Sequence, residues 1–330
     1  MEYALGSLPT GFYRQKTHGL AYGSGQSQQE ARDKAFFEAV ERFCSHFHGS
    51  EQFTTQPYDP ATCVHPNDLM QFTDLQIANA GLDAFGEQVE IAWMWGEPLH
   101  GGYKGKWIPA AMVLLDYADE HQPNFALPTS SGCAAGPDLA SATRSGVREL
   151  VERDAVALWW YRQALRPTVI PPRVEHGRTY EVLDVSTDFG LSVCVAISAR
   201  EDGSDPVFGA GSGRDLGAAA QDAIRELTQV LTWRRYWQDA SPYGYANVQD
   251  FQRGHTSATA SDAAVSSLPN MYVVNLTRAD VGLPVVRVVA PELLSHRLGM
   301  RNVRLSRVPE RLGWRCNRVP DATDFVECPL

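Results

Sequence analysis

The stretch KAFFEAVERF, residues 34–43, carries apolar side chains at helical spacing and predicts a helix that packs against the protein core. Glu38, Glu41 and Arg42 stand at positions i, i+3 and i+4 of this helix. Side chains at this spacing share one helical face. Three charges are therefore gathered on one face of a helix whose composition is otherwise that of a buried element.

The same spacing recurs in two further stretches of the chain, so that residues 23–42, 132–153 and 209–230 resemble one another. In all three, a glycine stands thirteen residues and an alanine seven residues before a glutamate, and a second polar residue follows three positions later. The matching positions are Gly25, Ala31, Glu38 and Glu41; Gly136, Ala142, Glu149 and Glu152; and Gly213, Ala219, Glu226 and Gln229. This predicts three copies of a unit in which a loop of small residues leads into a helix with its acids about four turns in.

Strand-like runs of apolar and β-branched residues accompany the predicted helices. AAMVLLDY (110–117) precedes the second repeat and LSVCVAIS (191–198) precedes the third, while VVNLT (273–277) and LPVVRVVAP (283–291) come late in the chain. Strands interspersed with helices predict an α/β or α+β fold, built from strand–loop–helix units that pack on one another.

The helices of the second and third repeats continue into strongly apolar stretches, at residues 155–161 and 230–237. Taken singly, a glutamate–arginine pair at i, i+4 is most often a solvated surface feature, and that interpretation stays open. The apolar continuations instead favour partly buried carboxylates, which are costly unless they are paired or bind a cation. Two helices with two carboxylates each suit magnesium, which prefers oxygen ligands, and adjacent arginines suit phosphate. The pattern therefore indicates a magnesium–nucleotide site.

Composition excludes several classes of protein. The chain has 330 residues, 44% hydrophobic and 21% charged, as expected for a globular protein that folds without metal or disulfides. A formal net charge of −10 argues against a general binder of nucleic acid or membrane surfaces. The six cysteines form no CxxC pair and are expected to be reduced. We see neither a signal peptide nor an apolar run long enough to span a membrane, so a cytoplasmic protein is expected.

Three stretches resemble the YcaO family: KAFFEAVERF, the block TSSGCAAGPDLASATRSGVRELVERDAVALWWY at 129–161, and VVNLTRADVGLPVVRVVAPEL at 273–293. The resemblance implies an α/β fold of pseudo-repeated units around an ATP site with several magnesium ions. We expect a single YcaO domain over residues 1–330, with no separate leader-binding domain. Its core units are expected at about 20–50, 129–165 and 206–240, with strands at about 271–293.

The resemblance also implies a reaction. Members of the family use ATP to phosphorylate the oxygen of a peptide amide after a nucleophile has attacked the carbonyl carbon. An internal Cys, Ser or Thr yields azolines, external sulfide yields a thioamide, often with a TfuA-type partner, and an internal amine or amide can yield an amidine. The implied substrate is a ribosomally made precursor peptide, presented by a leader-binding, E1-like or TfuA-like partner protein. Whether the protein forms a homodimer is left open.

By residue-level match, the resemblance assigns two groups of site residues. The metal-binding carboxylates would be Glu38, Glu41, Glu149 and Glu152. The ATP-binding positions would be Ser24, Lys34, Arg42, Arg153, Glu226 and Arg287. No residue is assigned a catalytic role of its own, because phosphoryl transfer depends mostly on positioning and on neutralising charge at the phosphate oxygens.

Several positions depart from the family pattern. Ser24 stands where the family often has a lysine, Lys34 where a serine is usual, and Asp222 where a basic residue is often seen. In the second block, the family commonly has an asparagine at the place of Ser131 or Pro137 and a glutamate at the place of Ser141; Pro137 and Ser141 can supply neither an amide side chain nor a carboxylate. We expect Lys34 to compensate for the missing lysine. The alternative is a decayed site in a non-catalytic scaffold or substrate-binding subunit of a peptide-modifying complex.

Overall fold

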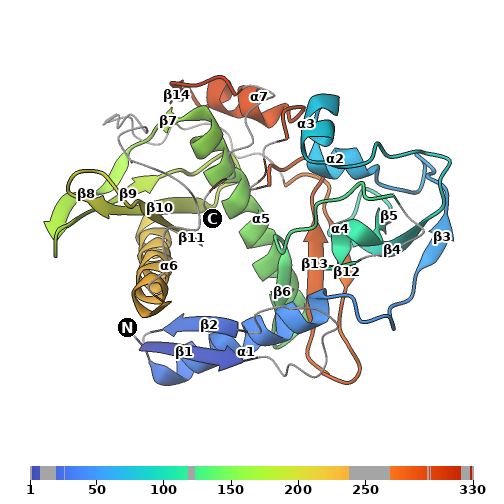
Figure 1. Ribbon diagram of the computed structural model, residues 1–330, viewed down its shortest axis with the longest axis horizontal. Helices are drawn as coiled ribbons and strands as arrows, with labels where there is room; N and C mark the ends of the chain where they lie inside the picture. Colours follow the sequence, from blue (N-terminus) through green and yellow to red (C-terminus); the bar gives the residue numbers. More distant parts are fainter. Residues whose placement is uncertain are drawn as a thin grey trace. The chain divides into compact units, whose positions relative to one another are not determined.

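The computed structural model (Figure 1) describes residues 2–7, 20–25, 27–117, 123–237, 268–295, 297, 299–320 and 328. The chain divides into two compact units, unit 1 with Met1–Leu150 and Pro269–Glu292, and unit 2 with Val151–Leu268 and Leu293–Leu330. Helices combined with several sheets confirm the predicted α/β class. That the whole chain acts as one domain stays a prediction.

Unit 1 contains an antiparallel sheet in the order β3-β4-β12-β13-β6, with β5 paired to β4 outside this path. Helix α1 (Gln28–Ser45) packs on the sheet through Val40 and Cys44, which share an apolar cluster with Val274 and Val285. The strands are β3 (Thr54–Gln56), β4 (Ile91–Pro98), β5 (Lys106–Pro109), β6 (Cys133–Ala135), β12 (Tyr272–Asn275) and β13 (Val285–Val289).

The remaining elements of unit 1 are a hairpin and short helices. Strands β1 (Glu2–Ser7) and β2 (Leu20–Gly25) pair antiparallel, and both contact α1. The short helices are α2 (Pro66–Met70), α3 (Asp74–Asn79) and α4 (Ala110–Val113). A second apolar cluster around the buried Trp93 includes Met112 of α4. Among the described residues, the core of unit 1 thus includes these two clusters.

Unit 2 contains a four-stranded antiparallel sheet in the order β11-β10-β9-β8. Its strands are β8 (Thr168–Glu175), β9 (Arg178–Asp184), β10 (Ser192–Arg200) and β11 (Val207–Gly213). Val207 packs with Ala219 and Ala223 of helix α6 (Leu216–Trp237), whereas Phe208 packs with Trp160 of helix α5 (Leu139–Arg162). Neighbouring residues of β11 thus pack on different helices.

The C-terminal part of unit 2 adds a helix and a small sheet. Helix α7 (Arg304–Arg311) contributes Leu305 and Val308 to the apolar cluster that contains the second half of α5. Strand β14 (Arg315–Cys316) pairs with β7 (Ala164–Leu165), directly after α5. Within the part of the chain that the structure describes, no helix is long and apolar enough to cross a membrane.

The repeated glycine–alanine spacing reflects close packing of each helix on the strand before it. A β-carbon added at the repeat glycine would lie 2.8–2.9 Å from the backbone nitrogen of the repeat alanine, too close for any side chain. These pairs are Gly25 and Ala31, Gly136 and Ala142, and Gly213 and Ala219. Glycine is needed at these positions because the backbones of strand and helix touch there.

A further repeat position, which the sequence comparison missed, begins each helix. Ser27, Asp138 and Asp215 stand eleven residues before the repeat glutamates and cap the helices. Ser27 Oγ accepts a hydrogen bond from the Glu30 N–H at 3.2 Å. Asp138 Oδ1 accepts from Ser141 N–H at 2.7 Å, and Asp215 Oδ1 from Ala218 N–H at 2.8 Å. Each cap satisfies a backbone donor in the first helical turn.

Three sequence expectations need correction. AAMVLLDY, expected as a strand, begins with helix α4, because Ala110, Met112, Val113 and Leu114 are all buried and the run shows no strand periodicity. The small-residue segments are not loops: β2 and β11 extend through Gly25 and Gly213, since close helix packing favours extended small residues. The repeat glutamates lie ten residues after each helix's first residue, about three turns rather than four. The other strand predictions are confirmed by β10, β12 and β13.

Candidate nucleotide and metal site

Three of the predicted metal-binding carboxylates interact in unit 1. Glu38 and Glu41 lie on α1, and Glu149 lies on the first half of α5. Burial raises the pKa of Glu41 well above its ordinary value, and the negative charges of Glu149 and Glu38 raise it further. The positive charges of Arg42 and Arg287 act in the opposite direction. Glu41 is therefore repelled by both of the other carboxylates, and a bound cation would relieve this repulsion.

Arg42 combines a local ion pair with access to solvent. Its guanidinium lies 2.5 Å from Glu38 Oε1, and its side chain is 42% exposed. An exposed i, i+4 pair of this kind contributes little to stability, about 0.3–0.5 kcal/mol. The guanidinium can therefore exchange its contacts for a phosphate group at small cost.

Glu149 is held in place by a backbone hydrogen bond. Its Oε2 accepts from the Gly132 N–H at 3.1 Å. Gly132 has φ +85°, and a β-carbon there would overlap the carbonyl oxygen of Val288. The glycine of the TSSGCAAG stretch thus lets the chain approach both β13 and α5, and it fixes the rotamer of the carboxylate.

Arg287 on β13 is a buried cation, with 7% of its surface exposed. Its guanidinium donates to the carbonyl oxygen of Thr129 and, at 3.2 Å, to Cys133 Sγ. Burial raises the pKa of the Cys133 thiol, so Cys133 is a neutral neighbour. Within the described residues, Arg287 Nε has no hydrogen-bond partner. A buried arginine with a donor to spare fits the predicted role of binding an anion.

Ser24 and Lys34 lie in different surroundings. Ser24, in β2, is 7% exposed, so its backbone is firmly packed. Lys34 lies on the exposed side of α1, where its Nζ contacts Glu30 Oε1 at 2.9 Å. In the structure Lys34 is thus a surface ion-pair partner, and its compensating role stays a prediction.

The remaining predicted residues belong to unit 2. Glu152 and Arg153 lie on the second half of α5, and Glu226 lies on α6. Glu152 Oε2 accepts a hydrogen bond from Ser212 Oγ at 2.5 Å. Glu226 Oε2 accepts from the Ala210 N–H at 2.9 Å, which ties α6 to β11. Glu149 and Glu226, equivalent in the repeat, thus both accept from a backbone N–H.

The departures from the family pattern have local structural partners. Ser141 Oγ lies 3.0 Å from Asp138 Oδ2 and accepts from Arg144 at 2.8 Å. Asp222 pairs with Arg225 on α6. The altered position 141 therefore takes part in capping α5, and position 222 in an ion pair along α6.

The carboxylates fit magnesium in kind, since oxygen ligands are what this ion prefers. Within the described residues, however, no three His, Cys, Asp or Glu side chains are arranged so that they could hold a metal ion together. Glu38, Glu41 and Glu149 belong to unit 1 and Glu152 to unit 2. The assignment of these four residues to metal therefore stays a prediction that rests on charge and donor type.

A buried ion network directly after the arginine of the second repeat was missed from the sequence. Asp154 is fully buried and accepts from Arg304 Nε at 2.8 Å and from the Leu294 N–H at 3.0 Å. Arg304 also contacts Asp188 Oδ1 at 2.9 Å. The only local signal was an acidic residue at the edge of the apolar stretch 155–161, because the partners are far away in the sequence.

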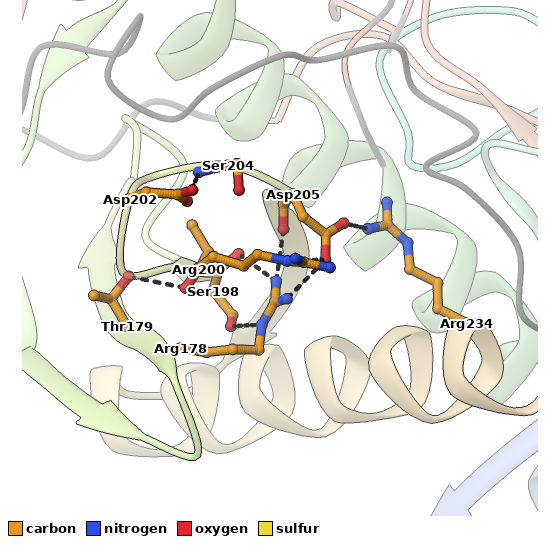
Figure 2. Close-up of polar contacts among 9 residues, drawn as sticks. Arg178, Thr179, Ser198, Arg200, Asp202, Ser204, Asp205 and Arg234 are labelled. Carbon is orange, nitrogen blue, oxygen red and sulfur yellow. Dashed lines mark hydrogen bonds and ion pairs between the residues drawn. The ribbon is translucent and has the colours of Figure 1, made fainter.

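A second polar network in unit 2 fixes the turn between β10 and β11 (Figure 2). Asp205, with φ +51°, contacts Arg178 at 2.8 Å and Arg234 of α6 at 2.9 Å. Arg178 Nε also donates to Ser198 Oγ at 2.9 Å. Because arginines from β9 and α6 share one carboxylate, this network joins the sheet to α6 away from Glu226.

Comparison with known proteins identifies relatives. A solved structure described as a heterocyclase in complex with substrate and cofactor is similar, with a TM-score of 0.77 and 25% identity over 89% of this chain and 47% of the other. The chain thus spans about half the length of that heterocyclase. YcaO from Methanopyrus kandleri, bound with AMPPCP and Mg2+, has the same fold, with a TM-score of 0.62 and 20% identity over 90% of this chain and 86% of the other.

A sequence relative and a family profile extend the comparison. An uncharacterized protein in the tfuA 3′ region of Rhizobium leguminosarum bv. trifolii is 27% identical over 263 residues, which are 68% of this chain and 58% of that protein. The profile described as YcaO cyclodehydratase, ATP- and Mg2+-binding, matches residues 22–269. The chain therefore belongs to the YcaO family.

Proposed function

We propose that this chain is an ATP- and Mg2+-dependent enzyme that activates a backbone amide of a peptide. The observation that supports it is the repulsion of Glu41 by Glu38 and Glu149, opposed by Arg42 and Arg287, in a member of the YcaO family. Carboxylates for cations and arginines for phosphate are the two groups that a magnesium–nucleotide site requires. The profile's description and the heterocyclase likeness support a peptide-modifying reaction.

When bound, ATP would supply the phosphoryl group that turns the amide oxygen into a leaving group after a nucleophile has added to the carbonyl carbon. Glu38, Glu41 and Glu149 would hold magnesium, with Glu152 as a further ligand. Arg42 and Arg287 would bind phosphate oxygens, as would Arg153. The task of these side chains is to position the phosphate and neutralise its charge, which accounts for most of the catalysis of phosphoryl transfer.

Two products are supported by different observations. The likeness to a heterocyclase favours cyclodehydration to an azoline. The relative whose gene lies in a tfuA 3′ region favours a thioamide formed with a TfuA-like partner. Mass spectrometry of the modified peptide separates them, because loss of water lowers the peptide mass and exchange of oxygen for sulfur raises it. In either case we propose a ribosomally made precursor peptide as substrate, and a separate protein that presents it.

Glu149→Gln tests the proposal. The variant keeps a side-chain oxygen for the Gly132 N–H, so the fold should persist, but it loses the charge that would hold magnesium. We expect titration calorimetry to show strong loss of Mg-ATP affinity, while Glu90→Gln, at an exposed position of unit 1, binds like the native chain. Native affinity in a folded Glu149→Gln variant would refute the metal assignment.

The alternative is a non-catalytic scaffold or substrate-binding subunit, which the altered positions 137 and 141 support. It predicts that the native chain binds its peptide but not Mg-ATP. Absence of nucleotide binding by the native chain, with peptide binding retained, would establish this alternative.

A further inference from the structure

Strand β11 presents two different faces. A β-carbon on Gly211 would lie 2.6 Å from the carbonyl oxygen of Ala219, so this residue faces α6. Phe208 faces α5, where its ring lies 5.4 Å from that of Trp160. Because side chains alternate along a strand, Phe208, Ala210 and Ser212 form one row on the α5 side. The row is apolar except at its last residue.

Ser212 ends this row with a buried hydroxyl. The residue is 3% exposed, and its Oγ donates to Glu152 Oε2 at 2.5 Å. Hydrogen bonds from a hydroxyl to a carboxylate are short and strong. The serine therefore holds one oxygen of Glu152 in a fixed position.

The backbone that carries Glu152 is also fixed. Two residues later on α5, Asp154 is anchored by Arg304 and by the Leu294 N–H. Because the helix backbone is held in place, the position of the Glu152 carboxylate depends on the rotamer of its side chain. Groups that hydrogen-bond a ligating carboxylate orient it and tune its affinity for metal.

The fold itself does not demand a hydroxyl at this position. The equivalent residue in the second repeat, fourteen positions before the repeat glutamate, is Ala135, and in the first repeat it is Ser24. A strand–helix unit of this type thus forms with alanine as well as with serine. The hydrogen bond to Glu152 therefore explains why a hydroxyl is present at position 212.

We infer that Ser212 is a positioning residue, which orients Glu152 for magnesium-dependent nucleotide binding. The inference rests on the proposed function, since it gives Glu152 its metal role. It adds a residue from β11 to the set on which magnesium affinity depends.

Ser212→Ala tests the inference in the full-length chain, with the magnesium concentration for half-maximal ATP binding as the readout. We expect this concentration to rise about 10- to 100-fold, as for other losses of a partner to a metal ligand. Ser212→Thr keeps the hydroxyl and should stay near the native value. Ser198→Ala is the matched control: it removes a fully buried hydroxyl from β10 that bonds Arg178 instead of a site carboxylate (Figure 2).

The outcomes separate the inference from the proposed function. An unchanged magnesium requirement in Ser212→Ala, or an equal rise in Ser198→Ala, would overturn the role of Ser212 while Mg-ATP binding by the native chain upholds the proposed function. Failure of the native chain to bind Mg-ATP would overturn both. A rise confined to Ser212→Ala would support the inference, since loss of stability alone affects both serine variants.

Discussion

Glu41→Gln should stabilise the metal-free protein at neutral pH. Burial, Glu149 and Glu38 raise the pKa of Glu41, so the folded chain binds this proton more tightly than the unfolded chain does. The stability that the protonated acid contributes is fully present below the unfolded pKa of about 4.3, and it is lost as the pH rises through the folded pKa. Glutamine resembles the neutral acid and keeps that contribution at every pH.

The expected gain follows from the balance of charges around Glu41. Two carboxylates oppose its ionisation and two arginines favour it, so burial decides the sign. A single stabilising substitution of this kind typically raises the free energy of unfolding by about 0.5–2 kcal/mol. With ~2–4 °C per kcal/mol for a domain of 150–250 residues, Tm should rise by roughly 1–8 °C. Near pH 3 the native chain and the variant should melt together, because Glu41 is then protonated in both the folded and the unfolded state.

Thermal melts at both pH values, with and without Mg2+, check the prediction. Magnesium should raise the Tm of the native chain more than that of Glu41→Gln, because the variant has lost a ligand. Glu30→Gln is the matched control on the same helix. It breaks the 2.9 Å pair with Lys34, an exposed pair worth about 0–1 kcal/mol, and should bring no gain. A metal-free Glu41→Gln that melts below the native chain at neutral pH would refute the reasoning.

Two further predictions concern the scaffold. Asp154→Asn should cost roughly 3–5 kcal/mol, because it removes the fully buried partner of a two-point ion pair and leaves Arg304 with Asp188 alone, and Tm should fall by about 6–20 °C. Asp138→Asn, at an exposed cap, should melt close to the native chain, and equal melting of the two variants would contradict the structural importance of the Asp154 pair. Gly211→Ala should lower the free energy of unfolding, measured with denaturant, by about 1–3 kcal/mol, because its β-carbon would overlap α6. Gly101→Ala, whose β-carbon would have no atom within 4 Å, should leave the stability unchanged. A Gly211→Ala variant as stable as the native chain would show that β11 and α6 can move apart at no cost.

The parts of the fold that the sequence predicted correctly depend on local spacing. A repeat glycine and a repeat alanine are six residues apart, and their contact is made within one strand–helix unit, so the spacing is visible in the sequence. The run at 110–117 was assigned wrongly because consecutive buried residues, such as Met112, Val113 and Leu114, leave no periodicity that separates a strand from a helical turn.

The supporting contacts of the candidate site could not be predicted in this way. Asp154 meets Arg304 across 150 residues of sequence, and Glu152 meets Ser212 across 60. Neither partner stands in a pattern that signals it, because a lone serine between glycines and an arginine after a loop are common in any chain. The residues that carry charge could thus be found from their spacing, whereas the residues that orient them required the structure.

The repeat also bears on the expected departure from the family pattern at position 141. In each repeat a cap fixes where the helix begins, and the contact between the repeat glycine and the repeat alanine fixes how the helix is rotated on its strand. The glutamate ten residues after the first residue of the helix then lies at an equivalent position in each repeat, about three turns from the cap. Ser141 lies in the first turn of α5, where its hydroxyl joins Asp138 and Arg144. A carboxylate can therefore be lost from the first turn while Glu149 and Glu152 keep their positions, because nothing that fixes the helix has changed. A site that loses a ligand in this way changes in charge and keeps its geometry, which is the condition under which a compensating cation such as Lys34 would be useful.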